Sequence, residues 1–132
     1  MPRVLVTGAL GQIGTELVSA ARQRYGVDNV VATDIRIPGS TSTLTSGPFE
    51  QVDCTNERRV HAVVERHRID TVYHLAALLS AVAEEKPQVA WQINIGGLYN
   101  VLEVARENGC AVFFPSSIGV FGPTTRRSTR PR

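Results

Sequence analysis

The chain has 132 residues, of which 42% are hydrophobic and 20% are charged. This length and composition are typical of one globular domain and exclude a disordered chain or a coiled coil, and no apolar run reaches the roughly 18 residues of a membrane span. The net charge of +2 depends on four arginines in the last seven residues, so the rest of the chain is mildly acidic, which argues against a nucleic-acid partner.

The first residues show no secretory leader pattern, and the only cysteines, Cys54 and Cys110, are too few for a disulfide framework and fit no short zinc spacing. We therefore expect free thiols, a cytoplasmic location and no metal site. The basic stretch 125–132 has no apolar residue, which predicts a disordered tail behind a single domain over residues 1–124.

The first predicted elements are a strand and a helix joined by a tight turn. Residues 3–7 (RVLVT) form a β-branched run that predicts a buried strand ending at Gly8. A helix is predicted over residues 12–25, with Gly26 as its stop. Its predicted apolar face consists of Ile13, Leu17, Val18 and Ala21.

A second strand, a long loop and a third strand are predicted next. Residues 29–34 (NVVATD) have the β-branched composition of a strand. Residues 38–48 are rich in Gly, Ser, Thr and Pro, and Leu44 is their only core-forming residue, which predicts a loop. A short third strand is predicted over residues 49–52.

The next helix is predicted over residues 55–68, with either Thr55 or Asn56 as its cap. Its apolar positions, at the spacing of an amphipathic helix, are Val60, Val63 and Val64. A fourth strand is predicted over residues 71–76 (TVYHLA).

A last helix and strand complete the pattern. Pro87 marks a helix start, and the helix is predicted to run to Glu107 and to close at Asn108 and Gly109. Its predicted apolar face consists of Ile95, Leu98, Val101, Leu102 and Ala105. A fifth strand is predicted over residues 111–114 (AVFF).

Strands that alternate with helices of this length predict right-handed βαβ units and a parallel sheet. The strands are continuously apolar, which is typical of a sheet covered by helices on both faces. The predicted fold class is therefore α/β, a Rossmann-type sheet of about five strands in the order 3-2-1-4-5.

Three glycines, Gly8, Gly11 and Gly14, lie between the first strand and the first helix. In a dinucleotide-binding turn the first glycine permits the sharp bend, the second lets a pyrophosphate approach the backbone, and the third lets the helix pack close to the strand. The free N–H groups and positive dipole end of the helix would then face the phosphates. The alternative is a purely structural role, in which these glycines form a tight strand-to-helix turn without a ligand.

Asp34 closes the second strand, twenty residues after Gly14. A carboxylate at this position can accept hydrogen bonds from both hydroxyls of the adenosine ribose and would repel a 2′-phosphate, which favours NAD over NADP. Arg36 lies nearby and weakens that preference. The alternative interpretation of Asp34 is a turn carboxylate at a strand end.

These motifs make the sequence recognisable. It resembles the extended short-chain dehydrogenase/reductase family, and within it the NAD-dependent L-threonine 3-dehydrogenases that are related to nucleotide-sugar epimerases. The matching blocks are residues 4–17 (VLVTGALGQIGTEL), 33–36 (TDIR), 74–81 (HLAALLSA), 92–105 (QINIGGLYNVLEVA) and 114–124 (FPSSIGVFGPT).

The resemblance implies a set of site residues along the carboxyl edge of the sheet. The implied NAD contacts are Gly8, Gly11, Gln12, Ile13, Gly14, Asp34, Ile35, Arg36, Asp53, Cys54, Leu75, Ala76, Ala77 and Asn94. Ser80 matches a substrate contact, and Ser117, with Ser116 as its alternative, matches the catalytic hydroxyl that also contacts the substrate. From the residues alone, Asp53, Asn94 and Ser80 could equally be caps or turn residues, and Ser117 part of a polar strand exit.

Other prominent side chains have structural interpretations. His74 lies on a predicted buried strand and is expected to be a satisfied core histidine, whereas His61 and His67 are expected to face solvent from a helix. Trp91 and Tyr99 are assigned to a helix packing surface. The resemblance also allows a homodimer through the helices around residues 79–108.

The family's chemistry depends on a tyrosine followed four residues later by a lysine, and these 132 residues contain no such pair. Without that proton acceptor, the chain is expected to bind NAD but not to complete the family reaction, here oxidation of the L-threonine 3-hydroxyl to 2-amino-3-oxobutanoate. We favour a shortened product, incomplete at the C-terminal side of the sheet, over a minimal module. The alternatives are a nucleotide-sugar 4-epimerase or dehydratase fragment and a non-catalytic NAD-binding module.

Overall fold

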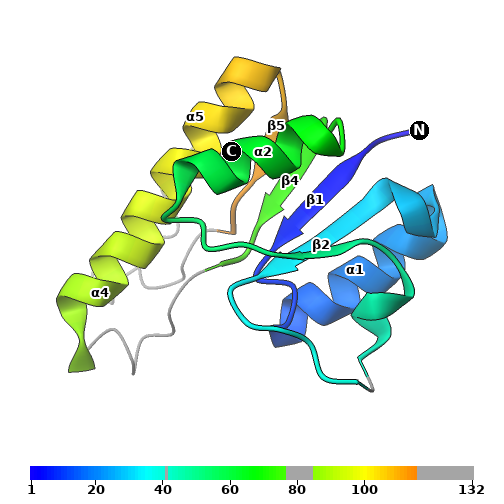
Figure 1. Ribbon diagram of the computed structural model, residues 1–132, viewed down its shortest axis with the longest axis horizontal. Coiled ribbons are helices and arrows are strands. Elements are labelled where there is room, and N and C mark those ends of the chain that lie inside the picture. The colour runs from blue at the N-terminus through cyan, green and yellow to red at the C-terminus, as the bar shows by residue number, and fades with distance from the viewer. Residues whose placement is uncertain (41, 77–84, 116–132) are drawn as a thin grey trace, which may run out of the picture.

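The computed structural model describes residues 1–40, 42–76 and 85–115 (Figure 1). The predictions for Ala77, Ser80, Ser116 and Ser117 and for the tail 125–132 lie outside these residues. The strands are β1 (Val4–Thr7), β2 (Val30–Asp34), β3 (Phe49–Gln51), β4 (Thr71–His74) and β5 (Ala111–Phe113). The helices are α1 (Gln12–Tyr25), α2 (Glu57–Arg66), α4 (Pro87–Trp91) and α5 (Gly97–Asn108), with a π-helical turn η3 (Gln92–Gly96) and two short 3₁₀ turns, η1 (Val27–Asn29) and η2 (Thr43–Ser46).

The five strands form one parallel sheet in the order β3-β2-β1-β4-β5, which confirms the predicted Rossmann-type topology. In the register of the sheet, Leu5 at its centre pairs with Val31 on one side and Val72 on the other. Because all strands run the same way, the carboxyl ends of β1, β2 and β4 come together at one edge, where open α/β sheets bind ligands.

Helices cover both faces of the sheet, as predicted (Figure 1). On one face, α1 and η2 bury Val18, Ala21 and Leu44 against β1 and β2. On the other face, α2 and α5 pack together over the sheet. The apolar side chains that they bury there include Val60, Val63, Val64, Val101 and Val104.

Helix ends follow local capping chemistry. The side chain of Asn56, and not that of Thr55, accepts the N–H of Arg59, so α2 begins two residues later than predicted. Gly109 ends α5 in the left-handed region, at φ 67°, which explains the predicted stop at this glycine.

Two predicted apolar faces were partly wrong. Ile13, in the first turn of α1, is 68% exposed, although Gly14 beside it is buried. Ile95 and Leu102 are also exposed, and α5 buries Val104 together with the predicted Val101 and Ala105. At Gly97 this helix passes close to the Cys54 side chain, because an added Cβ there would lie 3.3 Å from the Cβ of Cys54.

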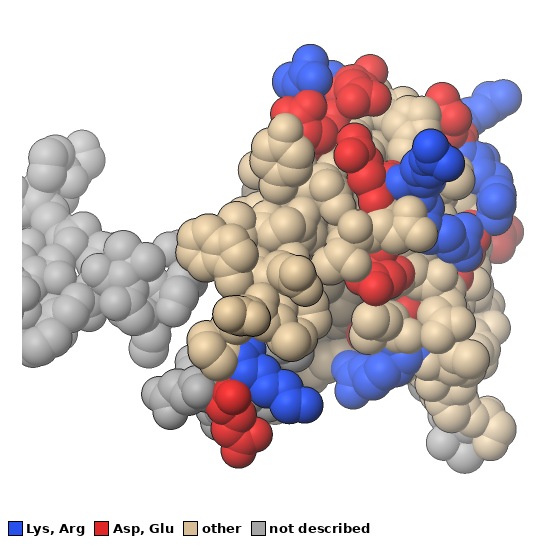
Figure 2. All heavy atoms as spheres, turned by 60° about the vertical axis from the view of Figure 1, so that its left-hand side comes forward, with Lys and Arg blue, Asp and Glu red and all other residues tan. Residues whose placement is uncertain are grey.

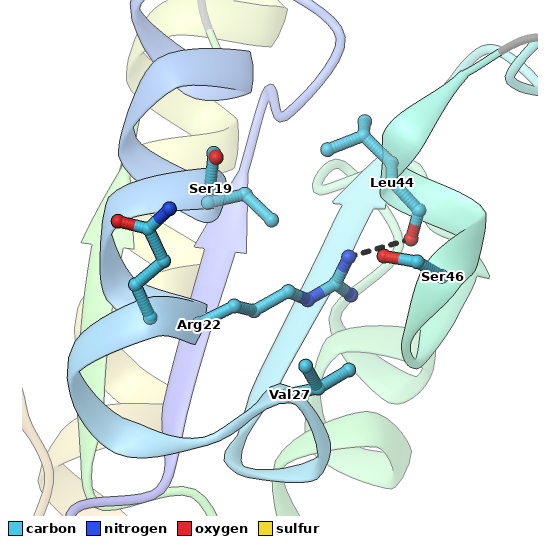
Figure 3. Close-up of a pocket in the computed structure, with 7 residues that line it drawn as sticks. Ser19, Arg22, Val27, Leu44 and Ser46 are labelled. Carbon is cyan, nitrogen blue, oxygen red and sulfur yellow. Dashed lines mark hydrogen bonds between the residues drawn. The ribbon is translucent and has the colours of Figure 1, made fainter.

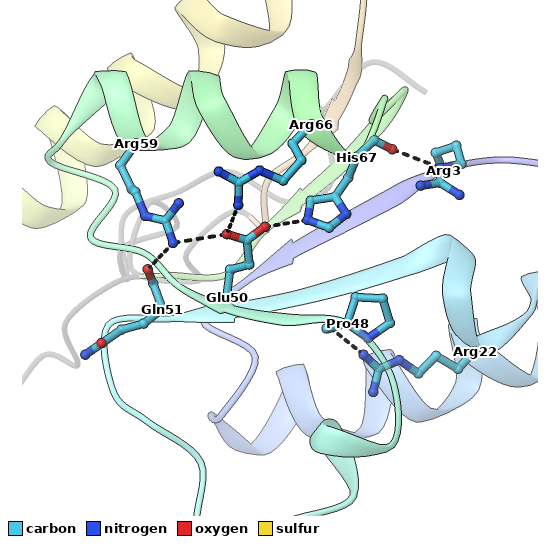
Figure 4. Close-up of polar contacts among 8 residues, drawn as sticks. All are labelled: Arg3, Arg22, Pro48, Glu50, Gln51, Arg59, Arg66 and His67. Atoms are coloured by element: carbon cyan, nitrogen blue, oxygen red, sulfur yellow. Dashed lines mark hydrogen bonds and ion pairs between the residues drawn. The ribbon is translucent and has the colours of Figure 1, made fainter.

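Arg22 of α1 is buried, which the helical pattern did not predict. Its guanidinium group donates hydrogen bonds to the carbonyl oxygens of Leu44 (Figure 3) and Pro48 (Figure 4), both at 2.7 Å, and to that of Val30. Burial lowers the pKa of Arg22, and Asp28 opposes this shift. The side chain thereby joins α1, β2 and the loop that leads to β3, beside a small cavity of about 220 Å³.

An ionic cluster fixes β3 to α2. Glu50 accepts hydrogen bonds from Arg59, at 3.1 Å, and from Arg66, at 2.8 Å, and it contacts His67 (Figure 4). Burial alone would raise the pKa of Glu50, but the contacts with His67, Arg59 and Arg66 outweigh it and lower the pKa. The prediction for His67 was therefore wrong, because this side chain turns toward Glu50 and is mostly buried.

Candidate functional site

The glycine turn between β1 and α1 is tightly packed. Gly8 has φ +66°, and a Cβ atom there would lie 2.7 Å from the backbone carbon of Leu75. A Cβ on Gly14 would lie 2.3 Å from the carbonyl oxygen of Gly8, so the helix can approach the strand only with glycine at this position. The N–H of Gly11 donates to the Gly8 carbonyl oxygen at 3.1 Å and closes the turn.

Among the described residues, no side chain caps the start of α1. Its N-cap is Gly11, and the first turn contains no acidic residue. The first N–H groups of a helix have no partner within the helix, and its N-terminus carries a partial positive charge. This turn can therefore receive an anion, and a diphosphate is the anion that the glycine spacing fits.

Asp34, at the end of β2, lies directly against this turn. Its side chain is only 5% exposed, and its Oδ2 atom accepts the N–H of Leu10 at 3.0 Å. Its Oδ1 atom accepts the N–H of Arg36, also at 3.0 Å. The glycine turn and the carboxylate are thus joined by a direct hydrogen bond, as a single site requires.

Thr7, which the sequence analysis did not single out, organises the adjoining segment. Its Oγ1 atom accepts the N–H of Leu75 at 3.0 Å and that of Ala76 at 3.2 Å, and it lies 2.8 Å from Nδ1 of His74. Two donors already fill the oxygen's lone pairs, so the hydroxyl donates its proton to Nδ1. The sequence does place a threonine at the end of β1. Its partner His74 on β4 is 67 residues away in the chain, so the sequence alone did not reveal the contact.

That arrangement fixes the tautomer of His74. With Nδ1 as an acceptor, the neutral ring carries its proton on Nε2, and this atom is buried without a partner among the described residues. Burial lowers the pKa of His74 from 6.5 to about 4. His74 is a core histidine, as predicted, and among the described residues only its Nδ1 atom has a hydrogen-bond partner.

The other predicted contacts occupy the same edge with different exposure. Ile35 is exposed beside Asp34, while Leu75 and Ala76 follow β4 and touch the glycine turn through their backbone. Asn94 is half-buried on η3. The part of the chain that the structure describes holds no group of three His, Cys, Asp or Glu side chains placed to bind a metal, and no helix there is long and apolar enough to cross a membrane.

Asp53 and Cys54 follow β3 and differ in what they can do. Asp53 is exposed and accepts hydrogen bonds from the N–H and the hydroxyl of Thr55, at 2.9 and 2.7 Å, so it forms a turn while an oxygen remains accessible. Cys54 is buried, and burial, followed by the charge of Asp53, raises the pKa of its thiol to about 12. This thiol is therefore no nucleophile.

A parallel sheet with a glycine turn, an uncapped helix start and an acid at the next strand's tip defines the class of dinucleotide-binding α/β proteins. Residues 4–132 match the NAD dependent epimerase/dehydratase family, and the chain belongs to that family. Over all 132 residues it is 54% identical to an uncharacterized epimerase/dehydratase of Staphylococcus saprophyticus. The chain spans 41% of that protein's length.

Two kinds of solved enzyme structure resemble this chain at different levels of identity. An L-threonine dehydrogenase of Clostridium difficile is 44% identical over 100% of this chain and 43% of its own, with a TM-score of 0.90. A UDP-glucose 4-epimerase of Stenotrophomonas maltophila, solved with bound NAD and formylated UDP-arabinopyranose, is 28% identical over 98% of this chain and 41% of its own, with a TM-score of 0.82.

Proposed function

We propose that the chain binds NAD, with the diphosphate at the glycine turn and the adenosine ribose on Asp34. The observation that carries this proposal is the hydrogen bond from Leu10 to Asp34, which joins the two halves of the site. The residues fit the group, because Gly8 and Gly14 leave no room for a Cβ and the first turn of α1 has no competing cap. Thr7 holds Leu75 and Ala76 at the adjoining edge, where the ribose next to the nicotinamide would lie.

For the whole protein we propose oxidation of the L-threonine 3-hydroxyl to 2-amino-3-oxobutanoate, in which bound NAD accepts the hydride. The proposal is supported by 44% identity to a threonine dehydrogenase, against 28% identity to a sugar-nucleotide epimerase. Ser117 would orient the hydroxyl, and Ser80 would contact the substrate. These 132 residues contain no tyrosine followed four residues later by lysine, so we propose that they bind the dinucleotide without completing the reaction.

Nucleotide-sugar 4-epimerase or dehydratase activity is the second candidate, because an epimerase shares the fold over 98% of this chain. The discriminating experiment uses the full-length Staphylococcus saprophyticus relative, with L-threonine and UDP-sugars offered in parallel. NADH formation with threonine alone supports the first candidate, and conversion of a UDP-sugar alone supports the second.

Titration calorimetry with NAD tests the binding proposal on this chain. Asp34→Ala should weaken NAD binding by roughly tenfold to a hundredfold, because two hydrogen bonds to a charged group are lost. Asp28→Ala is the matched control, since Asp28 lies on η1, at the opposite end of β2 from Asp34. Equal affinity in the wild type and Asp34→Ala, or binding by neither, would reject the proposal.

We also propose that the outer face of α4, η3 and α5 joins two copies of the chain. Four large hydrophobic side chains on this face are between 46% and 67% exposed: Trp91, Ile95, Tyr99 and Leu102. The exposure of Trp91 and Tyr99 differs from the predicted packing of these two residues against the rest of the chain. A shallow groove of about 610 Å³ is lined by Trp91, Ile95 and Tyr99 of this set. Figure 2 shows a broad area without charged side chains on this side of the molecule, which is the character of an interface core.

A further inference from the structure

A side chain of α1 reaches back to the glycine turn. Thr15 lies near the start of this helix and is half-buried. Its Oγ1 atom donates to the carbonyl oxygen of Gly11 at 2.9 Å and to that of Ala9 at 3.1 Å. A hydroxyl group has one proton, so the two carbonyl oxygens share it. The Thr15 hydroxyl therefore joins the helix to two peptide groups of the turn that leads into it.

The bond to Gly11 has an ordinary structural explanation, and the bond to Ala9 does not. Threonine side chains in helices commonly donate to the carbonyl oxygen four residues earlier, which for Thr15 is that of Gly11. Ala9 is six residues earlier and lies before the helix begins. Helical geometry alone does not bring its carbonyl group to Thr15, so this contact depends on the path of the glycine turn.

The peptide group between Ala9 and Leu10 is held at both ends. Its carbonyl oxygen accepts the Thr15 hydroxyl, and its N–H donates to Oδ2 of Asp34 at 3.0 Å. In a trans peptide these two groups point in opposite directions. Thr15 and Asp34 thus fix the orientation of this peptide group from opposite sides. Thr15 thereby belongs to the same chain of contacts that joins the turn to the carboxylate.

The peptide group between Gly11 and Gln12 is also fixed by Thr15. Its carbonyl oxygen accepts both the hydroxyl and the N–H of Thr15, the latter at 3.0 Å. Its own N–H, that of Gln12, therefore points out of the helix start, to the side where we propose the diphosphate. A glycine-rich turn can adopt other conformations, because glycine has few restrictions on φ and ψ. Conformations that rotate these peptide groups would turn carbonyl oxygens toward the diphosphate, which would repel them.

We propose that Thr15 is a positioning residue, whose hydroxyl group holds the glycine turn with its N–H groups directed at the diphosphate of a bound dinucleotide. This inference rests on the proposed NAD site and adds to it a residue that does not itself touch the ligand. A turn that is ordered before binding loses less conformational entropy when the ligand arrives. The hydroxyl group should therefore strengthen the binding of diphosphate compounds and not that of adenosine, which lacks the phosphates.

The test measures the binding of NAD, ADP and adenosine by NMR titration of the wild type and of Thr15→Val. Valine keeps the branched shape and replaces the hydroxyl with a methyl group. The variant should bind NAD and ADP about three- to tenfold more weakly, which corresponds to the net loss of one hydrogen bond. Its affinity for adenosine should stay within about twofold of the wild type.

Two further variants separate the hydroxyl group from the rest of the side chain. Thr15→Ser keeps the hydroxyl and should restore the wild-type affinities for NAD and ADP. Thr45→Val, on η2, is the matched control, because Thr45 makes the same kind of bond away from the site. Its Oγ1 atom donates to the carbonyl oxygen of Ser42 at 2.9 Å, and its replacement should leave all three affinities unchanged.

Hydrogen exchange tests the turn without any ligand. The Leu10 amide should exchange faster in Thr15→Val than in the wild type, because its peptide group has lost one of its two bonds. Exchange at Leu10 should be unchanged in Thr45→Val.

The outcomes distinguish the role of Thr15 from the site itself. Equal NAD affinity or equal Leu10 exchange in the wild type and Thr15→Val would overturn the inference. An equal loss of NAD and adenosine binding would also overturn it, because it would show a general disturbance of the fold. If Asp34→Ala weakens NAD binding and Thr15→Val does not, the NAD site stands and only the role of Thr15 is rejected. Equal binding by the wild type and Asp34→Ala would reject the site and the role of Thr15 with it.

Discussion

The central strands β1 and β2, which carry the glycine turn and Asp34, and the edge at β5 differ in how completely the chain covers them. All residues of β1 and β2 are buried, and each of these strands has a neighbour on both sides. At the other side, β5 has one neighbour among the described strands, and Phe113 on it is 56% exposed and stacks on Tyr73 of β4. An apolar strand edge of this kind is open to pairing with other chains.

This difference separates two tasks within one fold. The glycine turn, Asp34 and the strands that carry them are held together by contacts within the described residues. The exposed apolar residues of β5 and of the α4–α5 face remain uncovered by the chain itself. We therefore expect substitutions near the central strands to change stability, and substitutions on this open side to change association.

The largest change in the free energy of unfolding should come from replacing the buried Arg22. Arg22→Met keeps most of the side-chain volume but leaves the carbonyl oxygens of Leu44, Pro48 and Val30 without this donor. We expect the free energy of unfolding to fall by about 4 kcal/mol in urea titrations, because buried acceptors lose their partners. Arg24→Met is the control, since Arg24 is exposed and only contacts the Tyr25 ring. Equal losses in the two variants would contradict the account.

The next effect depends on pH and involves His74 on β4, the strand between β1 and β5. The pKa of His74 is about 4 in the folded chain and near 6.5 when unfolded, so the unfolded chain takes up a proton first as the pH falls. Stability that is present above pH 6.5 is thus lost between pH 6.5 and 4, by about 3 kcal/mol in total.

His74→Gln tests this assignment, because its amide oxygen can still accept the Thr7 hydroxyl. The variant should show a flatter dependence of unfolding free energy on pH across this window than the wild type. The same slope in this variant and in the wild type would show that His74 does not titrate as inferred.

The smallest effect on stability is expected on the open side, at Ile95. Ile95→Glu should change the free energy of unfolding by less than about 0.5 kcal/mol, because the side chain is 46% exposed. It should nevertheless shift a dimer to a monomer in sedimentation equilibrium. Ile37→Glu makes the same chemical change at a residue that is 73% exposed elsewhere and should leave association unchanged. A wild-type monomer, or dissociation by Ile37→Glu alone, would contradict the proposed interface.

Local signals predicted the fold well where neighbouring residues decide the structure. The bounds of α1 follow from Gly11 and Gly26, and the burial of Leu44 follows from its being the only core-forming residue in its loop. The strand order follows from the alternation of strands and helices. In the site, the glycine spacing and the position of Asp34 could also be predicted, because both are set by residues close together in the sequence.

Contacts between distant segments could not be predicted in this way. The burial of Arg22 depends on carbonyl groups up to 26 residues away, and helical periodicity contains no information about them. The tautomer of His74 depends on its contact with Thr7, which lies 67 residues away in the sequence. Arg36 was visible near Asp34 in the sequence, but its hold on both carboxylate oxygens required the structure.

The most direct test of the central claim follows backbone amide resonances by NMR while NAD is added to the 132-residue chain. If NAD binds at the glycine turn, the largest shifts are expected at Leu10, Gly11, Gln12 and Ile13, and all four should saturate with one affinity. No shift is expected at Ser19 or Gln23, which line the cavity beside Arg22. Shifts that are largest away from the glycine turn, or no shift at residues 10–13, would contradict it.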